Sequence, residues 1–243
     1  MKKIICLVLA SVLLFSLSAC SKVDNSYGVV SETQDMADEV SSKSDTDLPE
    51  IMTLDQKMSN YFDTSLFDEE NYADVYLGKK FEYEAVYDGY ELSVPTKMET
   101  LIENGWSLAE GSEYDENSLI FAKETVSVTF VNQNGAQLWA LFYNSSNSSI
   151  KLLKCRIVKF QIKNNYFENI EDYDAFNINN ITNTTAITDV IDALGTPSHF
   201  YQVTDDSYYF DYFLTKSDRR NKIRVYVNLS DDCVTAVEFS YYK

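Results

Sequence analysis

The stretch Tyr208-Tyr209-Phe210-Asp211-Tyr212-Phe213-Leu214 predicts a β-strand with one fully apolar face. Successive side chains of a strand point to opposite sides of a sheet, so residues of one parity share a face. The apolar face consists of Tyr208, Phe210, Tyr212 and Leu214, and the opposite face carries Tyr209, Asp211 and Phe213. We expect a helix to cover the apolar face and the mixed face to remain open.

The strands expected next in the chain continue both faces. The apolar side gains Ile223, Val225 and Val227, then Val237, Phe239 and Tyr241, and the other side gains Arg224, Tyr226 and Glu238. Tyrosine and arginine on an open sheet face resemble a protein-binding surface, because they combine large contact area with polar tips. We therefore predict a partner-binding site made of Tyr209, Phe213, Arg224 and Tyr226. Two alternatives are an ordinary solvated sheet in a tyrosine-rich protein and packing of one repeat on the other.

Short helices are expected before the strands of each half of the chain. Ile187 to Leu194 has an amphipathic pattern, with Thr185 as a plausible cap, and Gly195 and Pro197 end it. In the first half, Thr96 and Glu99 form a capping-box pattern before an apolar face of Met98, Leu101 and Ile102, and Gly105 ends that helix.

The same order of elements occurs twice, which indicates a tandem repeat. Phe81 and Tyr87 have the six-residue spacing of Phe167 and Tyr173. Val158-Lys159-Phe160 matches Val237-Glu238-Phe239, and each follows a cysteine. The strands expected in the two copies are 119–123, 126–131, 137–143 and 151–163, then 199–203, 208–215, 222–228 and 234–242. Chance matching between two strand-rich segments is the alternative.

These patterns predict an α+β fold with two tandem repeats, 80–163 and 164–243. Each repeat is expected to be a short helix region packed on its own antiparallel sheet. The second repeat, with Ile187-Thr188-Asp189-Val190-Ile191-Asp192-Ala193-Leu194-Gly195-Thr196-Pro197 followed by aromatic strands, resembles the β-lactamase-inhibitor-protein-like fold. The first repeat departs from it, because Gly105-Trp106 replaces Gly-Thr-Pro. The resemblance implies a concave sheet that binds other proteins, in some members to inhibit an enzyme and in others to support envelope assembly.

The N-terminus is built like a secretion signal. Lys2 and Lys3 precede an apolar run of about a dozen residues, which is too short to span a bilayer. The signal, residues 1–19, is followed by Cys20, and Leu17-Ser18-Ala19-Cys20 resembles the lipobox of bacterial lipoproteins. The resemblance implies cleavage before Cys20, acylation of its thiol and an anchor on the extracytoplasmic face of the bacterial cell membrane. An ordinary signal peptide with a chance cysteine is the alternative.

Between this signal and the first repeat lie two further segments. Residues 20–50 contain the cysteine and a serine-rich, acidic stretch with few large apolar residues, which predicts a disordered tether. Residues 51–79 are expected to form a short helix within 53–62 and a connector that packs on the first domain or remains loose. The net charge of −18 becomes −20 when Lys2 and Lys3 leave with the signal. Such a chain repels nucleic acid and anionic lipid, so the lipid anchor is its only expected membrane contact.

No motif in the sequence predicts a catalytic, cofactor or metal site. His199 is the only histidine, which excludes a histidine-based zinc site. The pairs Asp205-Asp206 and Asp231-Asp232 are typical of solvated turns, with weak Ca²⁺ binding as the alternative. A glycosidase that uses two carboxylates needs no local motif and stays open. Cys155 and Cys233 are expected to be two separate buried thiols, although a disulfide is permitted outside the membrane.

Together these observations predict a cell-envelope lipoprotein without enzymatic activity, which binds an unidentified protein partner through an open sheet face. One alternative is a structural or assembly component of an envelope complex, in which that face is permanently covered. Another is a hydrolase of cell-wall polymer.

Overall fold

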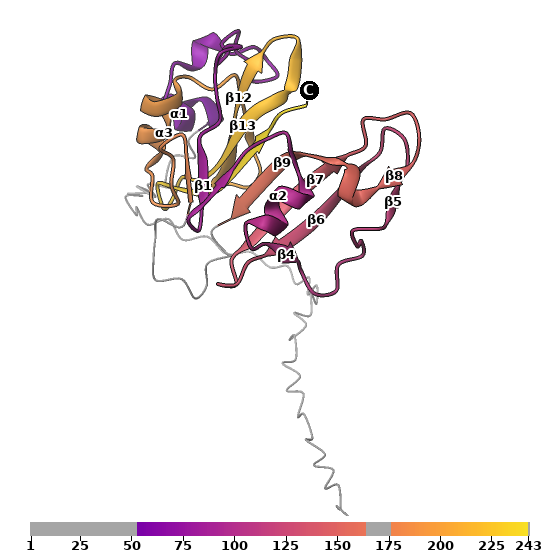
Figure 1. The fold of residues 1–243 in the computed structure, drawn as a ribbon. Helices are drawn as coiled ribbons and strands as arrows, with labels where there is room; N and C mark the ends of the chain where they lie inside the picture. Colours follow the sequence, from indigo (N-terminus) through magenta and orange to yellow (C-terminus); the bar gives the residue numbers. More distant parts are fainter. Residues whose placement is uncertain (1–52, 164–175, 243) are drawn as a thin grey trace, which may run out of the picture. The chain divides into compact units, whose positions relative to one another are not determined.

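The computed structural model describes residues 53–163 and 176–242 (Figure 1). The predicted signal, Cys20 and the tether lie outside the described residues, as do Phe167 and Tyr173 of the predicted repeat. Within the described ranges, no helix is both long and apolar enough to cross a bilayer. The segment from Glu50 to Lys243 belongs to one compact unit.

We call residues 80–163 and 176–242 the two halves of the chain. One antiparallel sheet runs through both halves. Its order is β11-β12-β13-β14-β9-β7-β6-β4, with β3 paired to β9. Each half contributes four neighbouring strands of this path, and the halves meet where Phe160 of β9 opposes Phe239 of β14. The bounds are β3 Thr96–Lys97, β4 Ser107–Leu108, β6 Thr125–Val131, β7 Gln137–Tyr143, β9 Arg156–Lys163, β11 His199–Gln202, β12 Ser207–Thr215, β13 Asp218–Asn228 and β14 Cys233–Ser240.

Two smaller sheets accompany the main one. The first has the order β10-β1-β2, formed by Phe176–Ile178, Ala85–Tyr87 and Tyr90–Leu92, and it again joins the two halves. The second pairs β5, Leu119–Ile120, with β8, Ile150–Lys151.

The helices are short. They comprise α1 Leu54–Met58, α2 Met98–Glu103, α3 Ile187–Leu194 and the 3₁₀ turns η1 Thr64–Leu66 and η2 Leu152–Lys154. Helix α3 ends at Gly195, whose φ of +81° suits a residue without a β-carbon. The predicted capping box of α2 does not form, because Thr96 lies in β3 and Lys97 takes the cap position without a side-chain hydrogen bond.

The predicted α+β fold is therefore wrong. The described structure is mostly β, and its α-helices are only five, six and eight residues long. We expected two separate sheets, each covered by its own helix region, but the last strands of the halves pair directly in one sheet. The physical reason is that the backbone groups of β9 and β14 are satisfied by pairing with each other, so neither strand leaves an open edge where the halves meet.

The predicted division of β12 into a buried and an open face is confirmed only in part: the apolar face is buried, but Asp211 and Phe213 on the opposite face are buried as well. Tyr208, Phe210, Tyr212 and Leu214 are all buried. Tyr208, Phe210 and Tyr212 belong to a core that includes the facing residues of the neighbouring strands and side chains of the helices, among them Met98, Leu101, Ile187 and Val190. The helical side chains therefore pack on the same side of the sheet as the apolar face of β12, whereas Tyr209 on the opposite face is only partly buried.

The two described cysteines are free thiols. Cys155 lies beyond one end of the β9–β14 pairing and Cys233 lies at the other end. At about 3.3 Å per residue they are separated by roughly 30 Å, whereas a disulfide needs α-carbons within about 7 Å. Burial raises the pKa of Cys155 to about 11. The expectation of separate thiols is confirmed, although Cys233 is only partly buried.

Candidate functional site

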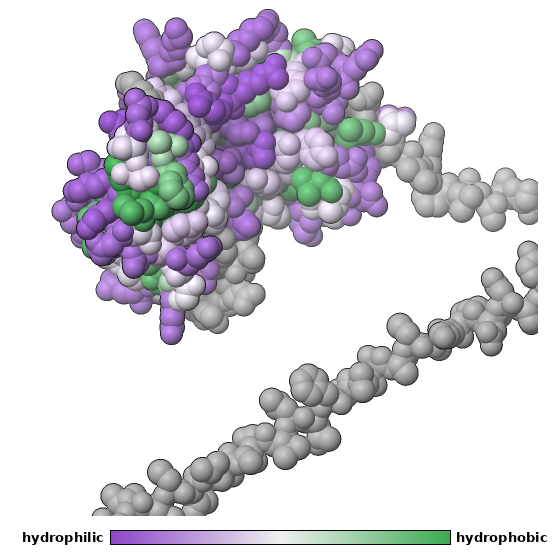
Figure 2. Space-filling model, turned by 90° about the vertical axis from the view of Figure 1, so that its right-hand side faces the viewer, coloured by the Kyte–Doolittle hydropathy of each residue, from purple (hydrophilic) through white to green (hydrophobic). Residues whose placement is uncertain are grey.

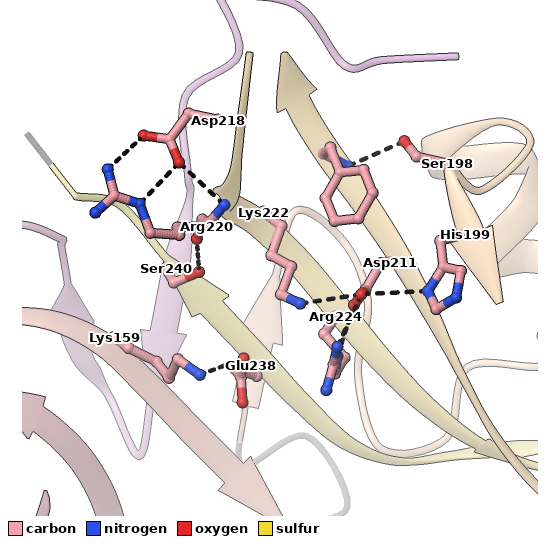
Figure 3. Close-up of polar contacts among 11 residues, drawn as sticks. Lys159, Ser198, His199, Asp211, Asp218, Arg220, Lys222, Arg224, Glu238 and Ser240 are labelled. Carbon is pink, nitrogen blue, oxygen red and sulfur yellow. Dashed lines mark hydrogen bonds and ion pairs between the residues drawn. The ribbon is translucent and has the colours of Figure 1, made fainter. Parts of the chain in front are cut away.

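A row of charged and polar side chains crosses the face of the sheet opposite the apolar core. The strand register aligns His199 of β11, Asp211 of β12, Arg224 of β13 and Glu238 of β14. These four residues have the parity opposite to the apolar core residues of the same strands, so they project on the other side of the sheet, where His199, Asp211 and Glu238 are themselves buried. Four consecutive strands thus bring their polar groups together (Figure 3).

Asp211 is the centre of this row and is only 2 % exposed. Its carboxylate accepts hydrogen bonds from Arg224 Nε at 2.6 Å and Arg224 Nη2 at 2.8 Å. Lys222 Nζ donates to Oδ2 of the same carboxylate at 2.9 Å. His199 Nδ1 lies 3.6 Å from Oδ2 on the other side (Figure 3). One buried carboxylate therefore holds two basic side chains in fixed positions.

The electrostatics of this cluster follow from these contacts. Burial alone would raise the Asp211 pKa, but the hydrogen bonds from Arg224 and the positive charge of Lys222 outweigh burial and lower it. Burial would lower the Arg224 pKa, but its hydrogen bonds to Asp211 raise it. Burial is the main cause of the lowered pKa of Lys222. Because two basic groups share one carboxylate, the cluster has excess positive charge in a chain whose net charge is −18.

Aromatic rings fix the Arg224 side chain from the outside. Its guanidinium lies 3.7 Å from the centre of the Tyr209 ring and 6.0 Å from that of Tyr226. Tyr201 stacks on Tyr209 at 5.3 Å and is 52 % exposed. We call Tyr201, Tyr209, Arg224 and Tyr226 the tyrosine–arginine cluster. It is a preorganised surface, because a cation between aromatic faces and a buried carboxylate has little freedom to lose on binding.

A second buried carboxylate extends the row towards the first half of the chain. Glu238 Oε1 lies 2.8 Å from Lys159 Nζ. The two groups form an ion pair, but their geometry is not that of a hydrogen bond. Lys159 Nζ in turn lies 5.9 Å from the ring centre of Trp139 on β7. This polar face therefore continues across the central strand pair, β9 and β14, rather than ending with the second half.

Phe213 does not contribute an exposed contact to this face, because it is only 3 % exposed. The connector covers it: Tyr72 stacks on Phe213 at 6.3 Å, and the Leu77 N–H donates to the Phe213 carbonyl. Arg219 then lies over the ring of Tyr72 at 4.1 Å. The sequence did not show whether the connector packs on the folded part or remains loose. No local pattern therefore indicated that it covers Phe213.

The other predicted site residues are Tyr209, Arg224, Tyr226 and Cys20. Tyr209, Arg224 and Tyr226 are brought together and are half-buried, whereas Cys20 lies outside the described residues. The acidic pairs of 205–206 and 231–232 are exposed. In the part of the chain that the structure describes, no three histidine, cysteine, aspartate or glutamate side chains gather closely enough to hold a metal ion.

Apolar exposure outside this face is scattered. Figure 2 shows small hydrophobic patches among mostly hydrophilic residues on the side that it presents. Two of the most exposed large apolar side chains are Leu119 at 66 % and Phe121 at 69 %. They lie in and just after β5, which is outside the tyrosine–arginine cluster.

No family model matches this chain, and no match is found among the curated proteins or the solved structures.

Proposed function

We propose that this chain is a lipid-anchored protein on the extracytoplasmic face of the bacterial cell membrane, where it binds a protein partner without catalysing a reaction. The anchor is supported by Leu17-Ser18-Ala19-Cys20 at the end of a signal-like segment. The binding role is supported by the tyrosine–arginine cluster. Membrane contact is through the lipid alone, because the strong negative charge opposes attraction to anionic head groups.

The observation that carries the binding role is the fixed position of Arg224. This side chain is bound twice by the buried Asp211 and lies against Tyr209. Arginine and tyrosine are enriched among residues that contribute most to protein–protein affinity. A cluster whose geometry is set before binding loses little conformational entropy when a partner covers it.

The anchor is tested by changing Cys20 to serine. We expect the Cys20→Ser variant to incorporate no labelled palmitate, because the acylated thiol is absent and serine does not replace it. The matched control is Cys6→Ser, which removes a cysteine inside the predicted signal and should leave labelling unchanged. Labelled fatty acid on the Cys20→Ser protein would contradict the proposed anchor.

The binding face is tested by affinity capture from the native envelope with the full-length chain in non-ionic detergent. We expect the double variant Tyr209→Ser, Tyr226→Ser to retain about tenfold less partner, the effect of losing one or two strong contacts. Arg224 is left in place, since removing it would also disturb the buried Asp211.

The matched control for this capture is Leu119→Ser, Phe121→Ser, which removes exposed apolar area outside the cluster and should retain the partner fully. Thermal unfolding followed by circular dichroism verifies that both variants are folded. Equal capture by the two double variants would contradict the proposed face. A partner that stays bound in fixed ratio throughout purification would instead favour an assembly component of an envelope complex.

A further inference from the structure

The outer edge of β6 is only partly paired. Strand β4 covers the end of β6, where Ser107 opposes Val131, and the Ala109 N–H donates to the Thr129 carbonyl at 2.9 Å. The chain then turns away from the sheet, with the Ser112 N–H donating to the Ala109 carbonyl and Gly111 at a φ of +78°. The first residues of β6 therefore have no neighbouring strand on that side among the described residues.

The hydrogen-bonding parity of β6 shows which groups this leaves unpaired. The Asn144 N–H donates to the Glu124 carbonyl, and the Asn132 N–H donates to the Ala136 carbonyl. Even-numbered residues of β6 thus direct their backbone N–H and C=O groups towards β7, and odd-numbered residues direct theirs outwards. The outward backbone groups of Thr125 and Ser127 meet no partner in the described ranges, and both residues are exposed.

A groove lies along this free edge. It has a volume of about 450 Å³ and is lined by residues 109–114 and 124–129. Three glutamates, Glu110, Glu113 and Glu124, contribute to the lining, which contains no lysine or arginine. Strand β6 has no proline, charge or bulge, which are the devices that usually protect an edge strand from pairing.

The opposite edge of the sheet is closed by the chain itself. The Phe200 N–H of β11 donates to the Asn71 carbonyl, and the Ala73 N–H donates to the Ser198 carbonyl. The connector therefore occupies the outer side of β11. Among the described strands of this path, only β6 combines unpaired backbone groups with this groove along its edge.

We propose that this groove receives an extended basic segment of a partner protein, which adds a strand to the free edge of β6. Backbone pairing supplies affinity in this mode of recognition, and side chains beside the edge supply selectivity. The three glutamates favour lysine and arginine, and the net charge of −18 attracts cationic chains over longer distances. A second copy of this chain is disfavoured, because two such edges would bring like charges together.

The test uses a fluorescent, end-blocked peptide of about eight alternating lysine and valine residues, the usual length of a strand. Its binding to the full-length chain in non-ionic detergent is measured by fluorescence anisotropy. We expect Ser127→Pro to weaken binding about tenfold, because proline removes an outward N–H and blocks the edge. Ser127→Ala keeps that N–H and should bind like the unchanged chain. Proline is tolerated where its nitrogen faces outwards from an edge strand.

A second variant tests the charge selectivity without touching the backbone. Glu110→Gln, Glu113→Gln should weaken binding of the lysine peptide several-fold at low salt, and the difference should shrink as salt screens the charges. A peptide of alternating glutamate and valine should bind at least about tenfold more weakly than the lysine peptide. Equal affinity of Ser127→Pro and Ser127→Ala would overturn the proposal, as would equal binding of the two peptides or concentration-dependent self-association that Ser127→Pro abolishes. These readouts are independent of the tyrosine–arginine cluster.

Discussion

Replacing Asp211 with asparagine is expected to lower the free energy of unfolding by about 3–5 kcal/mol, the usual cost of removing one partner from a buried ion pair. The carboxylate is 2 % exposed and is the acceptor for both Arg224 and Lys222. Asparagine keeps the size of the side chain but not its charge, so the two basic groups remain partly buried without compensation. Urea unfolding near neutral pH, followed by circular dichroism, measures the difference.

The effect of Asp211 should depend on pH with a definite sign. Its pKa is lower in the folded chain than in the unfolded chain, so the ionised carboxylate contributes stability above the unfolded pKa of about 4. That contribution is lost as the pH falls through the lowered pKa of the folded state. The difference in unfolding free energy between the unchanged chain and Asp211→Asn should therefore be constant near neutral pH and shrink below about pH 4.

Two further variants separate the ion pairs from general effects of substitution. Asp205→Asn changes an exposed aspartate in a turn and should cost less than about 0.5 kcal/mol. Adding Lys222→Met to Asp211→Asn should restore part of the lost stability, because it removes one of the uncompensated charges. A loss below about 1 kcal/mol for Asp211→Asn, or the same loss at pH 3 and pH 7, would contradict the role assigned to this carboxylate.

Local alternation in the sequence was enough to predict most strands and their faces. Gln137–Tyr143 was predicted with the bounds that β7 has, and the buried parity of β12 was also correct. Both predictions rest only on the alternation of apolar and polar side chains along a strand, which is visible in neighbouring residues of the sequence. For the same reason, Arg224 and Tyr226 were correctly placed on one face with Tyr209 and Asp211, although that face is less open than predicted.

Features that depend on distant partners were not predictable in this way. The pairing of β9 with β14 joins segments about 80 residues apart and turned two expected sheets into one. The strand expected over 151–163 is interrupted by η2, because Leu152 and Leu153 donate their N–H groups to the loop around Ser118 instead of continuing the sheet. The coverage of Phe213 depends on the connector, and the fixed position of Arg224 depends on a side-chain pair across two strands.

Truncating Phe239 to alanine is expected to destabilise both halves of the chain together. Phe239 is fully buried in β14, at the junction of the halves. Its ring centre lies 5.6 Å from that of Phe160 and 5.8 Å from that of Tyr83, and both partners belong to the first half. Removing a ring from such a position costs about 3–5 kcal/mol, since the surrounding structure fills the cavity only partly.

The distribution of tryptophan makes this coupling measurable. The chain has two tryptophans, Trp106 and Trp139, and both lie in the first half. Their fluorescence therefore reports unfolding of the first half, whereas Phe239 is in the second. If the shared sheet unfolds as one cooperative unit, Phe239→Ala should shift the urea midpoint of tryptophan fluorescence and that of circular dichroism by equal amounts.

The matched control is Val203→Ala, which shortens an exposed side chain just after β11 and should change the unfolding free energy by less than about 0.5 kcal/mol. Two independent repeats would behave differently from one sheet: Phe239→Ala would produce an early transition in circular dichroism and leave the tryptophan midpoint unchanged. That outcome would mean that the β9–β14 pairing contributes little to cooperativity. Equal shifts would mean that a ligand bound to either half stabilises both, because each half is folded only when the other is.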